Sequence, residues 1–472
     1  MIRERLARLA WIFSEKFGLI LLSMLSFFVF AHLLSPEELG VGVLIIVIVE
    51  LVGLLFCSLI EDPLVRQPTI TPGQRATAFW ACVVSGLGSA LLIGAGGFLY
   101  SDDTVVRAMV AVAALKVIAT LMARIYVAEM RRTGNFRLLA SRTLLGKILG
   151  ALGGILVAWQ GLGAWALIAQ ALIMELVSLL MLMRSDRRRL PLTFDRSWLT
   201  GVLIAGLPIA INTLCGQLLQ RGASIVLGLT AGVQAVGQFN FALRIIELPR
   251  TAVYNGLASY ALPAFARRAE QPARLASLFG SVSSVTVFLL TPCYIGLALT
   301  AQDLVLLVFG AKWLAAVPTL QVLAVMAALA NTALHAQSLL VAVNRIQTVV
   351  RPEVLTTLLA LALLGLLGEP LGALAGGLAM LGRTLMIVPI HVGALRRSIG
   401  FGARGWWWVN YRSLLASLLM TVAVLYFSTH NSLDSYAHWM ADIGVGALAY
   451  ALAYSLLHPR WWPEFKRMLA MR

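Results

Sequence analysis

The stretch Gly237-Gln-Phe-Asn-Phe-Ala-Leu-Arg-Ile-Ile-Glu-Leu-Pro-Arg-Thr-Ala-Val-Tyr-Asn255 carries three charges inside an apolar segment long enough to span a lipid bilayer. Its polar side chains recur at helical spacing and form one stripe, made of Asn240, Arg244, Glu247, Thr251 and Tyr254. A charge at the bilayer centre costs at least about 2.5–3.5 kcal/mol, so the stripe must face protein or water. It either borders a water-filled, anion-binding cavity or forms a polar seam in which Arg244 and Glu247 neutralise each other.

The composition of the 472-residue chain is that of a polytopic membrane protein. Hydrophobic residues make up 60% and charged residues 12%, whereas a soluble domain is about half apolar and a quarter charged. A net charge of +16 would suggest nucleic acid in a soluble protein, but most of the 37 Lys and Arg gather in or beside loops on one side. This bias predicts that both termini are cytoplasmic, and it removes the reason to expect a nucleic-acid partner.

Apolar segments of spanning length predict an all-α fold with about 14 transmembrane helices. The segments lie near 11–34, 40–60, 76–100, 104–130, 140–160, 164–183, 199–229, 233–262, 276–300, 316–342, 346–368, 371–395, 412–428 and 439–457. Two further pieces, Asp303 to Trp313 and Pro459 to Arg467, are expected to lie along the membrane surface.

Weak internal repeats indicate a duplicated architecture. Gly40 and Gly237 each open a span after a short loop and lie 197 residues apart, and other weak matches recur at similar offsets. An even number of spans in each copy makes the repeats parallel. We therefore expect two six-helix lobes, residues 1–195 and 196–400, around a central cavity. Residues 401–472 are expected to add two transmembrane helices and a cytoplasmic interfacial tail.

Motifs for enzymatic chemistry are missing from the sequence. There is no Walker motif, no Gly-x-Ser-x-Gly, no His-Glu-x-x-His and no Cys-x-x-Cys. The histidines are scattered, so we expect no catalytic residue, no metal site and no cofactor. The four cysteines lie in apolar spans without metal-ligand spacing and are expected to be small buried hydrophobes: Cys57, Cys82, Cys215 and Cys293.

Ionisable residues inside the predicted spans are the most informative polar set. They are Lys116, Arg221, Arg244, Arg250, Arg383, Glu50, Glu175 and Glu247. The excess of cations favours an anion-binding cavity. Arg221 and Arg250 lie nearer the membrane faces and could instead extend to the interface, which would leave the remaining charges balanced.

The offset of 197 residues that relates Gly40 to Gly237 also relates Glu50 to Glu247. Both acids lie about 15 Å from the outer end of their span. Each could be a structural acid, with Lys116 holding Glu50 and Arg244 holding Glu247. Alternatively, Glu50, which has no cation in its own span, takes up a proton during transport.

Several motifs resemble one known family. Gly237-x4-Ala-x-Arg with the following Leu-Pro, and then Ala261-Leu-Pro-Ala-Phe-Ala-Arg267, resembles the eighth helix of Wzx-type polysaccharide flippases. Val308-Phe-Gly-Ala-Lys-Trp313 with Pro318, and Gly161-Leu-Gly-Ala-Trp-Ala-Leu167, are similar to the same family. This polysaccharide transporter family belongs to the superfamily of multidrug, oligosaccharidyl-lipid and polysaccharide exporters. The resemblance covers nearly the whole chain and implies two six-helix lobes around a cationic cavity.

The resemblance also implies candidate site residues. The cations that would bind substrate are Arg244, Arg250, Arg221, Lys116 and Arg383. The polar or coupling residues of the cavity would be Glu50, Glu247, Asn240, Thr251 and Tyr254.

The implied function is transport without catalysis. The protein would flip an undecaprenyl-pyrophosphate-linked oligosaccharide across the bacterial inner membrane by alternating access, for lipopolysaccharide or exopolysaccharide export. Its partners would be this lipid, membrane lipids, and polysaccharide synthesis and polymerisation proteins. The alternatives are a multidrug or other lipid-linked precursor exporter of the same superfamily, a membrane-embedded polymerase or ligase, and a scaffold for a synthesis complex.

Overall fold

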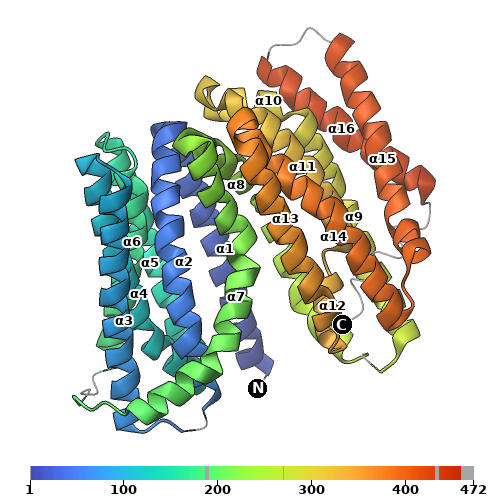
Figure 1. Cartoon of the computed structure of the whole chain (residues 1–472). Helices are drawn as coiled ribbons and strands as arrows, with labels where there is room; N and C mark the ends of the chain where they lie inside the picture. Colours follow the sequence, from blue (N-terminus) through green and yellow to red (C-terminus); the bar gives the residue numbers. More distant parts are fainter. Residues whose placement is uncertain (1, 68, 187–190, 269, 431–434, 459–472) are drawn as a thin grey trace. The chain divides into compact units, whose positions relative to one another are not determined.

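The computed structural model describes residues 2–67, 69–186, 191–268, 270–430 and 435–458, which form helices and no strand (Figure 1). The all-α prediction is therefore confirmed for the described residues. The predicted interfacial tail beyond residue 458 lies outside them, as does the side chain of Tyr254.

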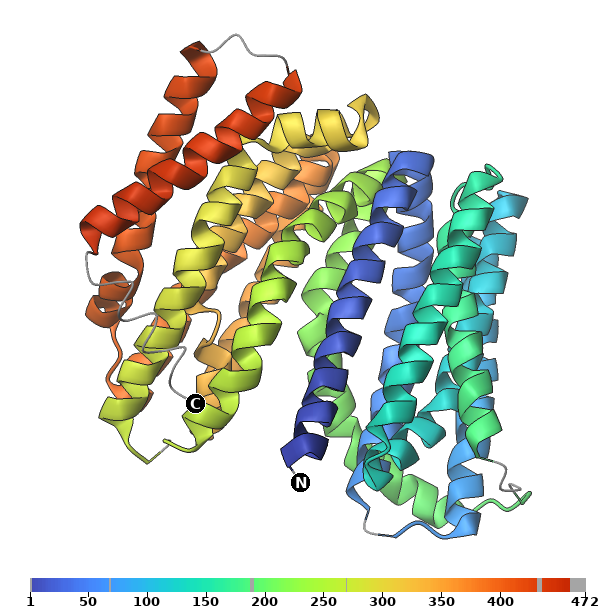
Figure 2. The ribbon, with the colours of Figure 1, turned by 180° about the vertical axis from the view of Figure 1, so that it is seen from behind.

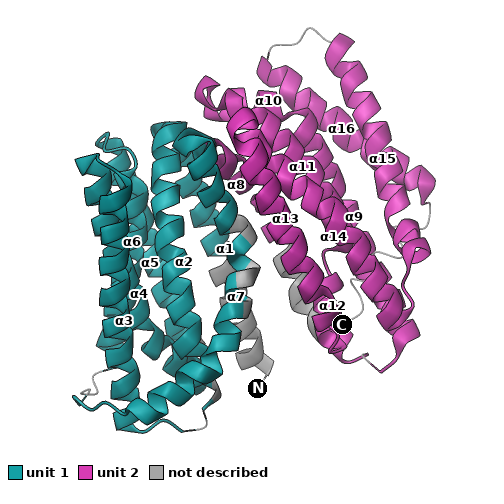
Figure 3. Cartoon of the chain, viewed as in Figure 1, with its two compact units in different colours: residues 1–237 teal, residues 238–472 magenta. Residues whose placement is uncertain are grey.

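The chain divides into two compact units, Met1–Gly237 and Gln238–Arg472 (Figure 3). Unit 1 contains α1 (Ile2–Leu33), α2 (Pro36–Arg66), α3 (Pro72–Tyr100), α4 (Thr104–Thr133), α5 (Phe136–Trp159), α6 (Trp165–Ser185) and α7 (Arg196–Thr230), and the unit boundary lies within α8 (Gly232–Ala266). Helix α3 packs on α4, α5 packs on α6, α2 packs on α4 and α7, and α1 packs on α5 (Figure 2).

Unit 2 contains the rest of α8 and the helices that follow it. These are α9 (Pro272–Leu299), α10 (Ala301–Leu304), α11 (Val317–Ala330), α12 (Ala336–Ala342), α13 (Gln347–Leu371), α14 (Ala373–Ile399), α15 (Ala403–His430) and α16 (Ser435–Leu457). Helix α14 packs on α11 and α13, and the C-terminal pair α15 and α16 packs on α9. The Tyr450 hydroxyl donates to the Phe288 carbonyl at 2.9 Å and ties α16 to α9.

The short connections predicted between spans are capped as their sequences suggest. Ser35 Oγ accepts a hydrogen bond from the Glu38 amide, and Glu38 Oε2 accepts one from the Ser35 amide at 2.8 Å. This reciprocal pair satisfies two backbone donors at the start of α2. Gly134 ends α4 with φ of 70°, a left-handed conformation that suits glycine.

Eleven helical segments of the described residues are long and apolar enough to cross a membrane. The other three predicted spans lie in α1, α7 and α8, so the number of 14 is consistent with the structure. One predicted span, 316–342, is not a continuous α-helix, because a 3-10 turn over Asn331–Ala333 separates α11 from α12. The buried Thr332 hydroxyl donates to the Leu329 carbonyl at 2.7 Å in this turn.

Asp303–Trp313, predicted to lie along the membrane surface, begins in the last two residues of α10 and continues in short π and 3-10 segments. Trp313 is fully buried and stacks on Phe241 with ring centroids 4.1 Å apart. The tryptophan therefore packs inside unit 2.

The unit boundary falls at residue 237, whereas the repeat predicted a lobe boundary after residue 195. Helix α7 accounts for the difference, because it packs along α2 and so belongs to unit 1. A Cβ added to Gly206 of α7 would overlap the Leu59 carbonyl of α2. Such a close backbone approach requires glycine.

Gly40 and Gly237, the two glycines matched by the repeat, lie against each other in unit 1. A Cβ on Gly40 would overlap the Val233 carbonyl, and a Cβ on Gly237 would overlap the Pro36 carbonyl. The first turns of α2 and α8 therefore meet backbone to backbone. Two positions that the predicted repeat makes equivalent thus contact each other, and the repeat itself stays a prediction.

The prediction of four buried cysteines is correct for Cys57 and Cys82 and wrong for Cys293. Cys293 is exposed on α9, where an apolar thiol can face lipid as readily as protein core. The side chain of Cys215 lies outside the described residues.

Candidate functional site

A cavity of about 330 Å³ lies within unit 1. This volume is near the lower end of the range of ligand pockets. Its wall comes from α2, α4, α6 and α7, and the ionisable residues in it are Glu50, Glu61, Asp62, Lys116, Arg124, Arg131, Glu175 and Arg221. The cavity is therefore built from charged groups that hydropathy alone would keep out of a membrane span.

Glu50 of α2 joins the cations of two other helices in the cavity wall. Lys116 Nζ of α4 lies 2.7 Å from Glu50 Oε1, and the Arg221 guanidinium of α7 contacts Glu50 Oε2. The Lys116 side chain is only 7% exposed, whereas that of Glu50 is 35% exposed. One carboxylate thus neutralises a deeply buried ammonium and a partly accessible guanidinium at the same time.

The structure therefore corrects one premise of the sequence analysis. Glu50 was a candidate for proton uptake because its own span contains no cation, yet cations from α4 and α7 reach it. The pairing with Lys116 is the structural alternative that the sequence left open. Arg221 does not point away to the interface, because its side chain bonds to Glu50 and Gln217.

A second acid in the cavity wall, Glu61, also holds two cations. Arg124 Nη1 lies 3.0 Å and Arg131 Nη1 lies 2.9 Å from its two carboxylate oxygens. The Glu61 side chain is 5% exposed. Each arginine presents five N–H donors, so both retain donors beyond those bonded to Glu61. The wall can therefore offer guanidinium groups to an anion without first breaking these pairs.

The charges of this cavity within unit 1 are balanced, and the cationic central cavity expected between two lobes stays a prediction. Four cations (Lys116, Arg124, Arg131 and Arg221) face four acids (Glu50, Glu61, Asp62 and Glu175). Burying an unpaired charge costs several kcal/mol, so paired charges are the arrangement that a folded membrane protein tolerates. An incoming anion must therefore compete with Glu50 for Arg221, whereas Arg124 and Arg131 keep further donors beside Glu61.

The polar stripe of α8 lies in unit 2 and does not contribute to this cavity. Asn240, Arg244, Glu247 and Thr251 are half-buried, and Arg250 is exposed. The Thr251 hydroxyl donates to the Glu247 carbonyl at 2.7 Å, a bond along the helix. A substrate contact for these residues stays a prediction.

Arg383 also lies in unit 2, on α14. Its Nε donates to Thr357 Oγ1 of α13 at 3.1 Å. Of the five predicted cations, the structure thus brings together Lys116 and Arg221 in one cavity and places Arg244, Arg250 and Arg383 in the other unit.

Arg124, Arg131 and Glu61 are site residues that the sequence analysis missed. The predicted second span ended at residue 60, but α2 continues to Arg66, so Glu61 lies inside the helix. Arg124 lies eight residues after Lys116 on α4, a spacing that puts both on one helical face. That spacing was the signal available in the sequence.

A family model described as polysaccharide biosynthesis protein matches residues 29–318, more than half of the chain. The chain belongs to this family. Its relatives include the succinoglycan biosynthesis transport protein ExoT of Rhizobium meliloti, 24% identical over 66% of this chain and 64% of that protein. The lipopolysaccharide biosynthesis protein WzxC of Escherichia coli is 28% identical over 34% of this chain and 32% of that protein. The match to ExoT thus spans less than two thirds of its length.

Solved structures confirm the fold of this family member. The lipid II flippase MurJ in an inward closed conformation has a TM-score of 0.77 and 13% sequence identity, with 96% of this chain and 99% of MurJ covered. An inward-facing multidrug resistance MATE family transporter has a TM-score of 0.58 and 15% identity, with 84% and 95% covered. The predicted resemblance to Wzx-type flippases is confirmed by the family match and by the relative WzxC, and the solved structures show that the chain has the fold of multi-pass membrane transporters.

Proposed function

We propose that this family member flips a lipid-linked oligosaccharide across the bacterial inner membrane, with the pyrophosphate of the lipid bound in the cavity of unit 1. The family match, the transport and polysaccharide functions in the names of relatives, and the MurJ-like fold support the transport of such a lipid. The observation that carries the proposal is the convergence of Lys116 and Arg221 on Glu50 in a cavity wall.

In the proposed mechanism, Glu50 is an internal competitor for the substrate anion. Without substrate, Glu50 neutralises Arg221 and Lys116. When a pyrophosphate enters the cavity, the Arg221 guanidinium leaves Glu50 and donates two parallel charge-assisted hydrogen bonds to the phosphate oxygens. Glu50 still neutralises Lys116. When the cavity opens to the other side, Glu50 returns to Arg221 and helps to expel the anion. The polyprenyl tail stays in the bilayer.

Other parts of the sequence-based prediction stay proposals alongside this mechanism. Arg244, Arg250 and Arg383 are candidates for further contacts with the lipid pyrophosphate. Polysaccharide synthesis and polymerisation proteins are its proposed partners, and catalysis is not part of the proposed role.

The experiment that tests the function is a flipping assay in liposomes. The probe is a fluorescent undecaprenyl pyrophosphate that carries one N-acetylglucosamine, and a membrane-impermeant quencher reports its arrival in the outer leaflet. We expect Arg221→Ala to abolish flipping and Arg221→Lys to restore part of it, because lysine keeps the charge but loses the planar fork.

Arg107→Ala is the matched control in the same unit. Arg107 pairs with Asp102 at the end of α4 outside the cavity, so this variant should flip the probe at the wild-type rate. Wild-type flipping by a well-folded Arg221→Ala protein would refute the assignment of the cavity.

We also propose that both termini are cytoplasmic, on the basis of the loop charges. Single cysteines at Asp102 and Thr133, at opposite ends of α4, should then react with an impermeant thiol reagent from outside and inside, respectively. The reverse labelling pattern would invert the topology.

A further inference from the structure

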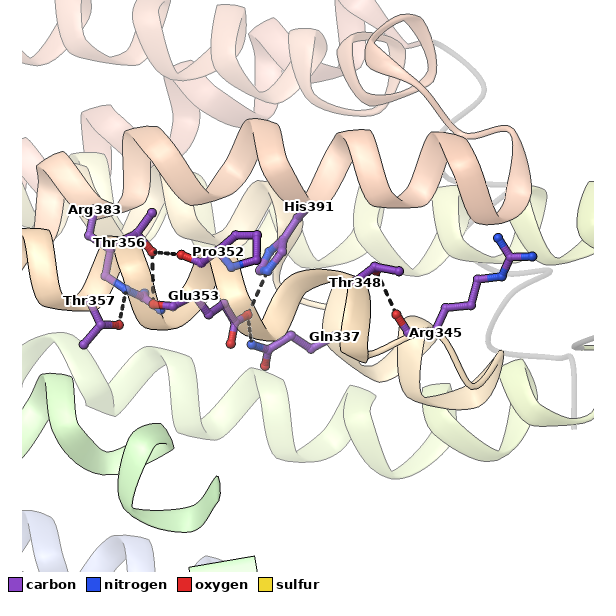
Figure 4. Close-up of polar contacts among 9 residues, drawn as sticks. All are labelled: Gln337, Arg345, Thr348, Pro352, Glu353, Thr356, Thr357, Arg383 and His391. Atoms are coloured by element: carbon purple, nitrogen blue, oxygen red, sulfur yellow. Dashed lines mark hydrogen bonds and ion pairs between the residues drawn. The ribbon is translucent and has the colours of Figure 1, made fainter. Parts of the chain in front are cut away.

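A second polar cluster lies in unit 2 and joins α12, α13 and α14. Figure 4 shows His391, Glu353 and Gln337 pointing toward one another from these three helices. His391 Nε2 lies 3.0 Å from Glu353 Oε1, and Gln337 Nε2 donates to the same oxygen. The side chains of His391 and Glu353 are 10% and 23% exposed, so both lie mostly away from solvent.

The pair lies within two predicted membrane spans. Glu353 is six residues from the start of α13, and His391 is eight residues from the end of α14. At 1.5 Å per residue, both lie about 10 Å inside the helix ends that the predicted topology places in the cytoplasm. Ionisable groups at such a depth in a transporter mark ion or substrate pathways, since burying them without a function is costly.

The other charged side chains on the two helices of the pair are Arg351 and Glu369 in α13, and Arg383, Arg396 and Arg397 in α14. Arg383, two turns before His391 on α14, also acts electrostatically on the Glu353 carboxylate, and it bonds to Thr357 one turn after Glu353. Helices α11 and α12 and the turn Asn331–Ala333 contribute no charged side chain to α14. The basic side chains of the other two helices that pack on α14 are Arg274 in the first turn of α9, and Arg404, Arg412 and His430 in α15.

The hydrogen-bond geometry defines which nitrogen can exchange a proton. An ionised carboxylate only accepts hydrogen bonds, so Nε2 of His391 must carry a hydrogen to bond to Glu353. In the neutral imidazole, Nδ1 then has a free lone pair. A second proton can be gained or lost at Nδ1 while the bond to Glu353 persists.

We propose that His391 is a proton-binding site that couples transport to a proton gradient, with Glu353 and Gln337 holding the imidazole in place. One proton binds Nδ1 and converts the imidazole to imidazolium, and the same proton later leaves from Nδ1. This inference rests on the proposed function for its transport step.

Protonation changes how firmly the three helices are held together. With His391 neutral, the bond joins a neutral donor to a carboxylate, whereas with His391 protonated it joins two opposite charges and gains their Coulomb attraction. The charged state of His391 therefore tightens the contact among α12, α13 and α14, and loss of the proton loosens it. A proton gradient can therefore shift the equilibrium between the tighter and the looser arrangement of these helices.

The cluster suits a proton better than a metal cation such as Na⁺. The Glu353 carboxylate, the oxygen ligand that Na⁺ would need, already bonds to His391 and Gln337 and faces the fixed charge of Arg383. In unit 1, by contrast, Glu50 is held by Lys116 and Arg221, and no histidine bonds to it among the described residues.

The first test needs no transport substrate. Nuclear magnetic resonance of ¹⁵N-histidine-labelled full-length protein in detergent micelles would follow the imidazole signals between about pH 5 and 8, where histidine changes its charge. Among the signals of the six histidines, we expect one that changes with pH in wild type and is missing from His391→Gln. A His391 signal that stays constant over this pH range would overturn the proposal.

The second test measures flipping of the fluorescent probe under an imposed pH gradient, with the membrane potential clamped and Na⁺ absent. Wild type should respond to the gradient. His391→Gln, which keeps an N–H donor for Glu353 but cannot titrate, should flip at a rate independent of the gradient. His391→Arg fixes the positive charge and should lose the response as well, which keeps the test decisive if one variant misfolds.

The matched control is His335→Gln, at another buried histidine of unit 2. His335 Nε2 lies 2.8 Å from Thr286 Oγ1, and this variant should keep the wild-type response. A retained response in His391→Gln, or wild-type flipping that follows only a Na⁺ gradient, would refute proton coupling. A wild-type protein that does not flip the probe would count against the proposed function alone, because the resonance experiment still decides the proton site.

Discussion

The two units of the molecule handle buried charge in different ways. In unit 1, Glu50 and Glu61 are each paired with two basic side chains, lysine or arginine. In unit 2, Glu353 is held by an imidazole and an amide. The anion site that we propose thus lies among lysine and arginine, and the proton site that we propose lies at a histidine. A proton-driven transporter needs both kinds of site, one for its anion and one for the proton that resets it.

The largest effect on stability should follow the loss of a carboxylate in unit 1. Glu50→Gln leaves the buried Lys116 and the nearby Arg221 without their anion. Removing one partner of a buried ion pair lowers the free energy of unfolding by about 3–5 kcal/mol. Because Glu50 is partly exposed, we expect a loss of about 2–3 kcal/mol. The measurement is the unfolding midpoint of purified protein in detergent.

A second substitution separates the charge effect from a general loss of packing. Adding Lys116→Met to Glu50→Gln removes the unpaired ammonium and should recover part of the stability, as expected for coupled residues. If the double variant is as unstable as the sum of the single variants, the pair does not act through charge.

In unit 2, replacing the buried carboxylate of Glu353 should lower the free energy of unfolding by less. Glu353→Gln keeps a hydrogen-bond acceptor for Gln337 and His391, and His391 can remain neutral, so we expect a loss of about 1 kcal/mol. The matched control is Glu369→Gln, at an exposed acid of the same helix, which should leave the unfolding midpoint unchanged. A destabilisation by Glu353→Gln as large as that by Glu50→Gln would mean that unit 2 also depends on fixed ion pairing.

The smallest effect should come from the exposed pair at the end of α4. Asp102 is fully exposed and lies 3.1 Å from Arg107. Exposed ion pairs contribute about 0–1 kcal/mol and weaken with salt, so Asp102→Asn should shift the unfolding midpoint very little, and even less at high salt. A shift comparable with that of Glu50→Gln would show that burial does not explain the difference between these pairs.

The fold could be predicted from the sequence because a membrane span depends on length and apolarity, which are local properties. The interruption at Asn331–Ala333 escaped prediction, since its residues fit either a continuous span or a break. Apolar sequence alone does not distinguish the two.

The site could be predicted only in part, because a pairing depends on the rotation of each helix about its axis. The sequence suggested that Lys116 reaches Glu50, but it could not show that Arg221 of α7 does so as well. For Glu353 and His391 a signal existed: each lies 19 residues from Gly372, the turn between α13 and α14. In an antiparallel helical hairpin, residues equally far from the turn lie at the same depth.

The cysteines give the natural chain a built-in chemical reporter. Cys57 forms part of the cavity wall in unit 1, whereas Cys82 is fully buried and Cys293 is exposed on α9. A small thiol reagent can therefore sense whether the cavity is open or filled from the rate at which it modifies Cys57, once Cys293 has been blocked. Bound substrate should shield that thiol. For the same reason, replacing every cysteine to prepare a labelling background also alters the wall that the substrate would touch.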